Sequence, residues 1–194
     1  MLLTQFQIMG RDLFARGLVA SRSGNLSVRM SDKILITRKH IMLNNLGERD
    51  LVETGVERNE RGTPLAGAEL TIHRCIYRNT GALAVVHAHP PYTVALSLCE
   101  DEIVPQDREG KLNLGRISII APASAGQSPR GLPDEISRAL CESPVVIVRG
   151  HGTYATGQLL EEAYHRTTVL EESCRILCIL KSIGVSLQNG LKVV

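Results

Sequence analysis

The chain has 194 residues, of which 43% are hydrophobic and 3% aromatic, and its formal net charge is +2. A chain of this length and apolar content can bury a sizeable core, and we expect residues 1–194 to form a single domain. The weak charge gives no support for binding to nucleic acid or an anionic membrane, and no apolar stretch reaches the roughly 18 to 20 residues of a membrane helix. The N-terminus has no signal-peptide pattern, so we expect a cytoplasmic protein without nucleic-acid or membrane partners.

The first part of the chain predicts a helix, three short strands and a second helix. Apolar residues at helical spacing predict a helix over 3–18. Alternating apolar residues predict strands over 26–29 and 33–37, joined by a turn of hairpin length, and a further strand around 51–53. Apolar residues that recur at intervals of three and four predict a helix over 69–77.

In the rest of the chain, strands alternate with helices. The predicted strands are 84–87, 117–120 and 145–148, and the predicted helices are 92–98, 133–141 and 159–183, the last ended by Gly184. Because several strands are also joined by hairpin-length turns, the pattern favours a layered α/β or α+β domain over a doubly wound parallel sheet.

Three histidines lie at the ends of predicted strands. His87 and His89 follow the apolar run 83–86 and project from the same face of an extended chain. His151 lies between two glycines directly after the strand 145–148. Neutral imidazole is a good ligand for Zn²⁺ and related cations, and catalytic zinc usually has three protein ligands and an open position. The histidines therefore predict a site for one divalent cation, against the alternative that each is a hydrogen-bonded core residue.

The five cysteines do not indicate a disulfide framework, because their number is odd and their spacing is not compact. Cys174 and Cys178 lie one helical turn apart and could contribute to a metal site. We favour the alternative that they are small apolar residues on a packed helix face.

Four landmarks of the sequence resemble the class II aldolase/adducin head domain family over nearly the whole chain. They are Ser-Gly-Asn-Leu-Ser-Val-Arg at 23–29, Glu69 at the start of a helix that carries His73, the pair His87 and His89, and Gly-His-Gly at 150–152 before a long final helix. Within that family the chain is most similar to the L-fuculose-phosphate aldolases. The resemblance implies a central, mostly antiparallel sheet flanked by helices, and a cyclic homotetramer with the metal near a subunit boundary.

The matching motifs also imply roles for single residues. His87, His89 and His151 would bind the metal, which we expect to be Zn²⁺ or another divalent cation such as Mn²⁺, Co²⁺ or Fe²⁺. Glu69 would be the catalytic acid/base; without the resemblance it would be interpreted as a helix-start carboxylate stabilised by the helix dipole.

The implied reaction is retro-aldol cleavage of a small ketose phosphate similar to L-fuculose 1-phosphate. A metal acting as a Lewis acid stabilises the enediolate, and a carboxylate carries the proton. Gly24 and Asn25 would bind the anionic end of the substrate; taken alone, Ser-Gly-Asn is an ordinary turn sequence.

The anion pocket departs from the family pattern. The related aldolases have two serines directly before the catalytic Glu, where this chain has Gly67 and Ala68, and a Thr-Gly turn after the second strand, where it has Thr-Arg-Lys-His at 37–40. Neutral phosphate donors are therefore absent, and we expect Arg38 or Lys39 to hold the anion by charge. This leaves open a phosphate held differently or a carboxylate-bearing substrate, and also the alternative that both basic residues point to solvent.

A tyrosine that donates a proton across the subunit boundary in those aldolases has no match in this chain. The corresponding stretch, 104–110, offers only Asp107 and Glu109 as proton carriers. The sequence therefore offers no tyrosine for the second proton transfer in this stretch.

Other functions of the same framework remain open. A dehydratase of the methylthioribulose-1-phosphate type, or a decarboxylase, would use the same metal-stabilised enolate. The 4-epimerases acting on L-ribulose 5-phosphate usually have Asp where this chain has Glu69, which disfavours them. An adducin-like interaction domain would lack the histidines, which disfavours a non-enzymatic role.

Overall fold

The structure is a computed structural model that describes residues 2–121 and 131–185. Its centre is an eight-stranded sheet with the strand order β3-β2-β1-β4-β8-β7-β6-β5. The strands are β1 Asn25–Met30, β2 Lys33–Thr37, β3 Leu51–Gly55, β4 Ala84–Ala88, β5 Glu102–Ile103, β6 Ile117–Ile120, β7 Val145–Val148 and β8 Gly152–Gly157.

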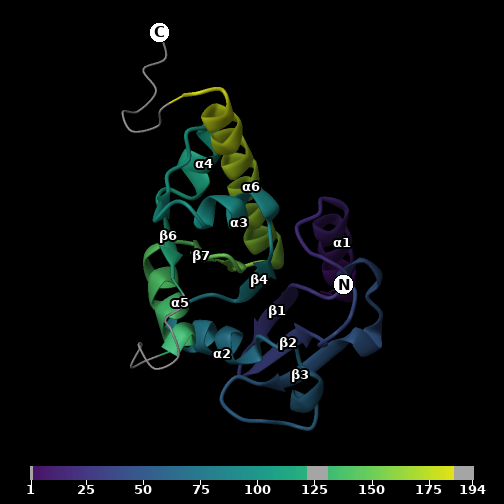
Figure 1. Cartoon of the computed structure of the whole chain (residues 1–194). Coiled ribbons are helices and arrows are strands. Elements are labelled where there is room, and N and C mark those ends of the chain that lie inside the picture. Colours follow the sequence, from purple (N-terminus) through teal and green to yellow (C-terminus); the bar gives the residue numbers. More distant parts are fainter. Residues whose placement is uncertain (1, 122–130, 186–194) are drawn as a thin grey trace.

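Helices cover both faces of this sheet (Figure 1). The α-helices are α1 Leu2–Ala15, α2 Leu70–Asn79, α3 Pro91–Ser97, α4 Arg108–Asn113, α5 Gly131–Glu142 and α6 Leu160–Ser182, and the 3₁₀ helices are η1 Leu43–Asn45, η2 Glu48–Asp50 and η3 Thr63–Leu65. In the described parts of the chain, no helix is both long and apolar enough to cross a membrane.

The sheet is mostly antiparallel. Of its neighbouring strand pairs only β6 and β7 run parallel. The predicted layered α/β fold, with a mostly antiparallel sheet flanked by helices, is therefore confirmed.

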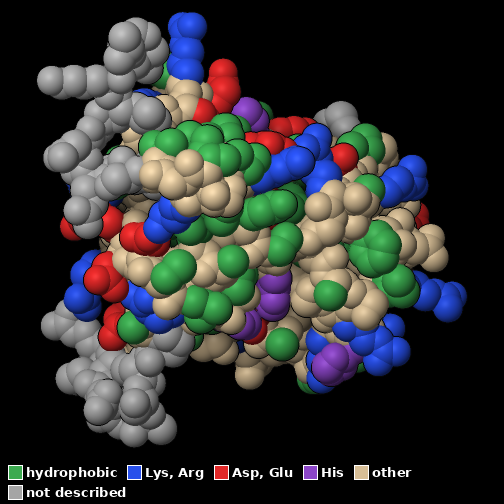
Figure 2. Space-filling view, turned by 45° about the horizontal axis from the view of Figure 1, so that its top comes forward, with side chains coloured by type: hydrophobic (Ala, Val, Ile, Leu, Met, Phe, Trp, Pro, Cys, Tyr) green, Lys and Arg blue, Asp and Glu red, His purple; other side chains and the backbone are tan. Residues whose placement is uncertain are grey.

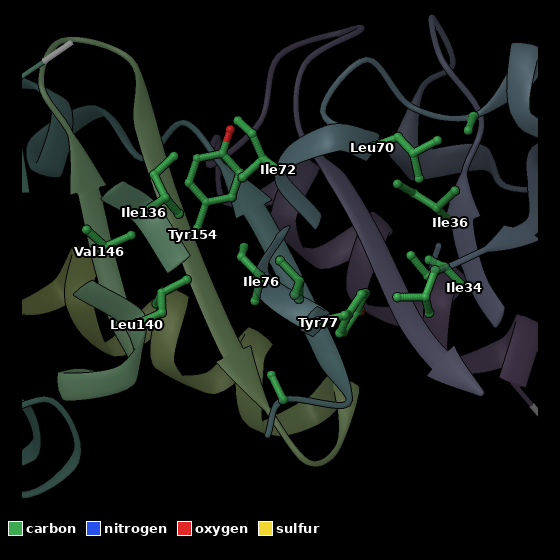
Figure 3. Close-up of a cluster of buried hydrophobic side chains, with 14 of the residues drawn as sticks. Ile34, Ile36, Leu70, Ile72, Ile76, Tyr77, Ile136, Leu140, Val146 and Tyr154 are labelled. Carbon is green, nitrogen blue, oxygen red and sulfur yellow. The ribbon is translucent and has the colours of Figure 1, made fainter. Parts of the chain in front are cut away.

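Alternate side chains of the central strands pack into different cores, as the period of two in a strand requires. On β4, Val85 packs with α2 and α5, whereas Val86 packs with α1 and α6 on the opposite face. Figure 3 shows the first of these cores, in which Tyr154 and Val146 from the sheet meet Ile136 and Leu140 from α5. On β8, Tyr154 packs in the first core, whereas Ala155 packs against α6 in a third core on the opposite face. The central strands β4 and β8 are therefore held between layers of helix, which fixes the position of the residues at the strand ends.

The helices and strands predicted from periodicity are all present, with ends that differ by up to three residues. Six elements were not predicted: the 3₁₀ helices η1, η2 and η3, the short strand β5, the short helix α4 and the central strand β8. All six residues of β8 are buried, but the sequence Gly-Thr-Tyr-Ala-Thr-Gly lacks a run of large apolar residues. Its glycines and threonines are equally typical of a turn. The segment is therefore recognised as a strand only from its pairing with neighbouring strands in the structure.

Candidate active site

Two adjacent strands bring the three predicted histidines together. His87 lies on β4, His89 follows that strand directly, and His151 lies in the turn between β7 and β8. Because β8 pairs with both β4 and β7, this turn lies beside the end of β4. One ring nitrogen from each histidine lies within 4.8 Å of those of the other two.

Two glycines allow the backbone to approach this cluster closely. A Cβ atom at Gly24 would lie 2.9 Å from the carbonyl oxygen of His87, and Gly24 has a φ of +76°, which disfavours other residues. A Cβ atom at Gly152 would lie 2.4 Å from the carbonyl oxygen of Ala88 and 3.2 Å from Cδ2 of His89. The strand ends that carry the histidines can therefore approach this closely only because positions 24 and 152 carry no side chain.

The donor set fits a divalent cation. Nδ1 of His87 lies 2.9 Å from the carbonyl oxygen of Thr153, which assigns the ring proton to Nδ1 and leaves the Nε2 lone pair free. The Nε2 atoms of His87 and His89 are 3.0 Å apart, a distance at which two lone pairs repel unless a proton or cation lies between them. Burial lowers the pKa of His89 to about 4 and that of His87 well below its usual value, so both rings are neutral near pH 7. Neutral imidazoles that converge in this way are a ligand set for zinc and related cations.

Glu69 lies beside the histidines at the N-terminus of α2. It occupies the N-cap position, but its side chain makes no capping hydrogen bond. Instead, the hydroxyl of Tyr154 donates a hydrogen bond to Oε2 of Glu69 over 3.0 Å. The carboxylate is therefore directed to the site rather than to the helix terminus, which a simple helix-start role would not require.

A pocket of about 240 Å³ unites these groups. Its lining includes the three predicted metal ligands, the predicted acid/base and the predicted anion-binding residues: Gly24, Asn25, Arg38, Lys39, Gly67, Ala68, Glu69, His87, His89 and His151. Arg22 and His40 also line it and were not predicted, although each adjoins a predicted motif in the sequence. Figure 2 shows histidine side chains at a hollow in one face of the molecule, with basic side chains further along that face.

Backbone pairing explains why the basic residues reach the pocket. Arg38 forms an isolated antiparallel bridge with Ala66, and the amide of Lys39 donates to the carbonyl oxygen of Leu65 over 3.0 Å. The end of β2 is thus tied to the segment that leads into Glu69. None of the ion pairs among the described residues involves Arg22, Arg38 or Lys39, which leaves three cationic side chains available to an anion.

Asn25 supplies a buried polar group to the same pocket. Its side chain is 6% exposed, and its Oδ1 atom has no hydrogen-bond partner in the structure. A buried polar atom without a partner costs about 1 to 3 kcal/mol. A ligand in the pocket can remove this penalty, since the amide can present either its oxygen or its NH₂ group after rotation.

The other candidates from the sequence, Asp107, Glu109 and Cys174, cap a helix, bond within it or pack in the core. Asp107 accepts a hydrogen bond from the amide of Gly110 over 2.7 Å and caps α4, and Glu109 accepts one from Asn113. Neither is among the described residues that line the pocket. Cys174 is fully buried in the core, where burial raises its thiol pKa to about 12, and the histidine cluster includes no cysteine among the described residues. The interpretation of Cys174 as a packed apolar residue is therefore confirmed.

A buried glutamate that the sequence did not reveal supports the chain just after His89. Glu171 on α6 is 7% exposed and accepts hydrogen bonds from the amides of Tyr92 and Thr93, each over 2.9 Å. These are free amides of the first turn of α3, whose own N-cap, Pro90, makes no side-chain cap. Glu171 thereby anchors the segment next to the histidine pair from a distant part of the sequence.

Comparison with known proteins identifies relatives over most of the chain. Residues 5–178 match the family described as Class II Aldolase and Adducin N-terminal domain. An L-fuculose phosphate aldolase of Methanocaldococcus jannaschii is 32% identical, with 89% of this chain and 93% of that protein aligned. A crystal structure of L-fuculose-1-phosphate aldolase from Thermus thermophilus is 36% identical and has a TM-score of 0.86, covering 96% of this chain and 98% of that one.

A second kind of relative is named for a different activity. A probable bifunctional methylthioribose-1-phosphate isomerase/methylthioribulose-1-phosphate dehydratase of Nocardia farcinica is 34% identical over 86% of this chain. The chain spans only 33% of that longer protein.

Proposed function

Because the chain belongs to the class II aldolase and adducin N-terminal domain family, we propose that it is a metal-dependent aldehyde-lyase that cleaves a small sugar phosphate in a retro-aldol reaction. The observation that carries this proposal is the convergence of three imidazoles and one carboxylate in a pocket with unpaired cationic side chains. A ketose phosphate similar to L-fuculose 1-phosphate is the proposed substrate class, because relatives that are 32% and 36% identical are named L-fuculose phosphate aldolases.

His87, His89 and His151 would hold the divalent cation, and Zn²⁺ is the first choice because it favours nitrogen ligands. Mn²⁺, Co²⁺ and Fe²⁺ are the alternatives. When bound, the cation supplies Lewis acidity, which stabilises negative charge that develops on substrate oxygens. All three histidines line the pocket, so a cation held by them would be accessible to a substrate there.

Glu69 is the proposed acid/base. A carboxylate at this position can accept a proton from a substrate hydroxyl and return it to carbon, the two proton transfers that cleavage of a carbon–carbon bond beside a ketone needs. Its hydrogen bond from Tyr154 leaves the second carboxylate oxygen free for this exchange.

The anionic end of the substrate would lie between the turn at Gly24 and Asn25 and the basic residues at the end of β2. Arg38 and Lys39 replace the neutral donors of related aldolases, and Arg22 adds a third cation at the rim. Gly67 and Ala68 would shape the floor of this subsite through their backbone.

The test is a screen of phosphorylated keto-sugars for aldehyde release, with metal-stripped protein as the control. Glu69→Gln should lower turnover by about 10²- to 10⁴-fold while the metal remains bound. The exposed Glu142→Gln on α5 is the matched control and should retain full turnover. Replacing all three histidines by Ala should abolish metal binding, and stoichiometric metal in that variant would overturn the site.

A dehydratase remains the second candidate, because Gly67 and Ala68 depart from the aldolase pattern and a dehydratase-containing relative is 34% identical. Mass spectrometry of the products separates the possibilities. A retro-aldol reaction divides the carbon skeleton, dehydration removes one water and leaves the skeleton intact, and decarboxylation releases carbon dioxide.

We further propose that residues 1–194 form one domain, which assembles into a homotetramer in the cytoplasm and has no nucleic-acid or membrane partner. The support for the tetramer is the family relationship together with the rather apolar chain, whose mean hydropathy is +0.01.

A further inference from the structure

Tyr154 occupies a special position in the sheet beside the proposed active site. It is the direct cross-strand partner of His87 in the β4–β8 pair, and His87 is in turn the partner of Asn25 in the β1–β4 pair. Partners directly opposite each other project from the same face of a sheet. Asn25, His87 and Tyr154 therefore form one row of side chains across three strands.

Tyr154 contacts two functional groups at once. Its ring stacks on the ring of His87, with the centroids 4.3 Å apart and the planes inclined by 14°. Its hydroxyl donates to Oε2 of Glu69 over 3.0 Å. The side chain is 1% exposed and packs in the core with Ile72 and Ile136 (Figure 3), so its position is fixed by its neighbours.

Glu69 depends on this contact for its orientation. Among the described residues, the hydroxyl of Tyr154 is the only group found to donate a hydrogen bond to its carboxylate, and the side chain does not cap α2. A half-buried glutamate with three rotatable bonds and no other anchor would otherwise sample several rotamers.

We propose that Tyr154 is a positioning residue that fixes the carboxylate of Glu69 relative to the ring of His87. This inference rests on the proposed function, since it assigns Tyr154 to the proposed acid/base and to a proposed metal ligand. It applies equally to an aldolase and to a dehydratase, because both need a proton carrier at a fixed place beside the cation.

Tyr154→Phe tests the hydroxyl alone, because the phenyl ring preserves the stacking on His87. We expect kcat to fall by about 10- to 10²-fold, the effect of a misplaced catalytic group. KM should stay within about twofold, and the metal content should equal that of the wild type, because the substrate and metal contacts remain.

Tyr77→Phe is the matched control. Tyr77 is fully buried in the same core, and its hydroxyl is hydrogen-bonded to Oγ of Ser27 over 2.6 Å. This variant also loses one buried hydroxyl, so it should lose stability without the loss of kcat. Equal kcat values for the two variants would overturn the proposal.

A double variant separates positioning from a general structural effect. If Tyr154 acts through Glu69, Tyr154→Phe should not lower the residual turnover of Glu69→Gln further. An additive loss would show that Tyr154 acts by another route.

A crystal structure of Tyr154→Phe gives a readout that does not depend on turnover. We expect the Glu69 carboxylate to leave its position or to occupy several conformers, and an unchanged, well-ordered Glu69 would refute the proposal. If the wild type acts on no screened substrate, the proposed function fails. The crystal structure of Tyr154→Phe would still show whether Tyr154 holds the Glu69 carboxylate in place.

Discussion

The close approach of β8 to β4 at Gly152 makes Gly152→Ala a sharp test of how the histidine cluster is built. A Cβ atom there would lie 2.4 Å from the carbonyl oxygen of Ala88, which is 0.6 Å short of the 3.0 Å that Cβ contacts essentially always reach. The obstacle is backbone rather than a flexible side chain, so one strand end must move.

This movement should affect both stability and metal binding. Overpacking of this kind costs about 1 to 3 kcal/mol, and each kcal/mol lowers the Tm of a chain of this size by about 2 to 4 °C. A displacement of 0.6 Å also exceeds the roughly 0.2 Å tolerance of metal–ligand distances. We therefore expect the affinity for Zn²⁺ to fall by about 10-fold or more.

The assay combines thermal unfolding of the metal-free protein with Zn²⁺ titration against a chromophoric chelator. Gly81→Ala is the control, because a Cβ at Gly81 would have nothing within 4 Å, and its stability should change by less than about 1 kcal/mol. Wild-type metal affinity in Gly152→Ala would refute the reasoning about the site, and an unchanged Tm would refute the steric argument itself.

Two further predictions concern the substrate and the assembly. Asn25→Ala, Arg38→Ala and Lys39→Ala should each raise KM, by about 10-fold or more where a charge-assisted contact worth about 1.5 to 3 kcal/mol is lost. The exposed Lys111→Ala on α4 is the control. An effect confined to Asn25 would show that the basic residues are only surface charge. Sedimentation should give a species about four times the chain mass, and a monomer of 21.2 kDa at micromolar concentration would contradict the tetramer.

Local patterns in the sequence were sufficient to predict most of the α-helices and strands. The hairpin of β1 and β2 follows from alternation of apolar residues across a short turn, and its antiparallel register pairs Met30 with Lys33. Helix α3 follows from prolines that are tolerated in a first turn. Its capping by Glu171 could not be predicted, because the two segments are separated by 78 residues from Thr93 to Glu171.

The candidate site was predictable where its chemistry is carried by residue type and order along the chain. The three histidines could be identified as candidate ligands because each lies at the end of a predicted strand. Glu69 was identified only through the family resemblance, because its local pattern is that of an ordinary helix start. Arg22 was missed because an exposed arginine in a turn has no local signature of ligand binding. Tyr154 was missed together with β8, whose small and polar residues do not show the periodicity of a buried strand.

The sequence by itself determined the alternation that produces a layered sheet and identified the three imidazoles as candidate ligands, whereas the carboxylate and the basic residues became candidates through the family resemblance. Only the tertiary structure could determine which groups meet. The pairing of β4 with both β1 and β8 places Asn25, His87 and Tyr154 in one row. The bridge of Arg38 with Ala66 holds the end of β2 at the pocket that Glu69 also lines. The physical reason is that strand register is set by long-range hydrogen bonds and by burial on both faces of the sheet, neither of which is encoded within one segment.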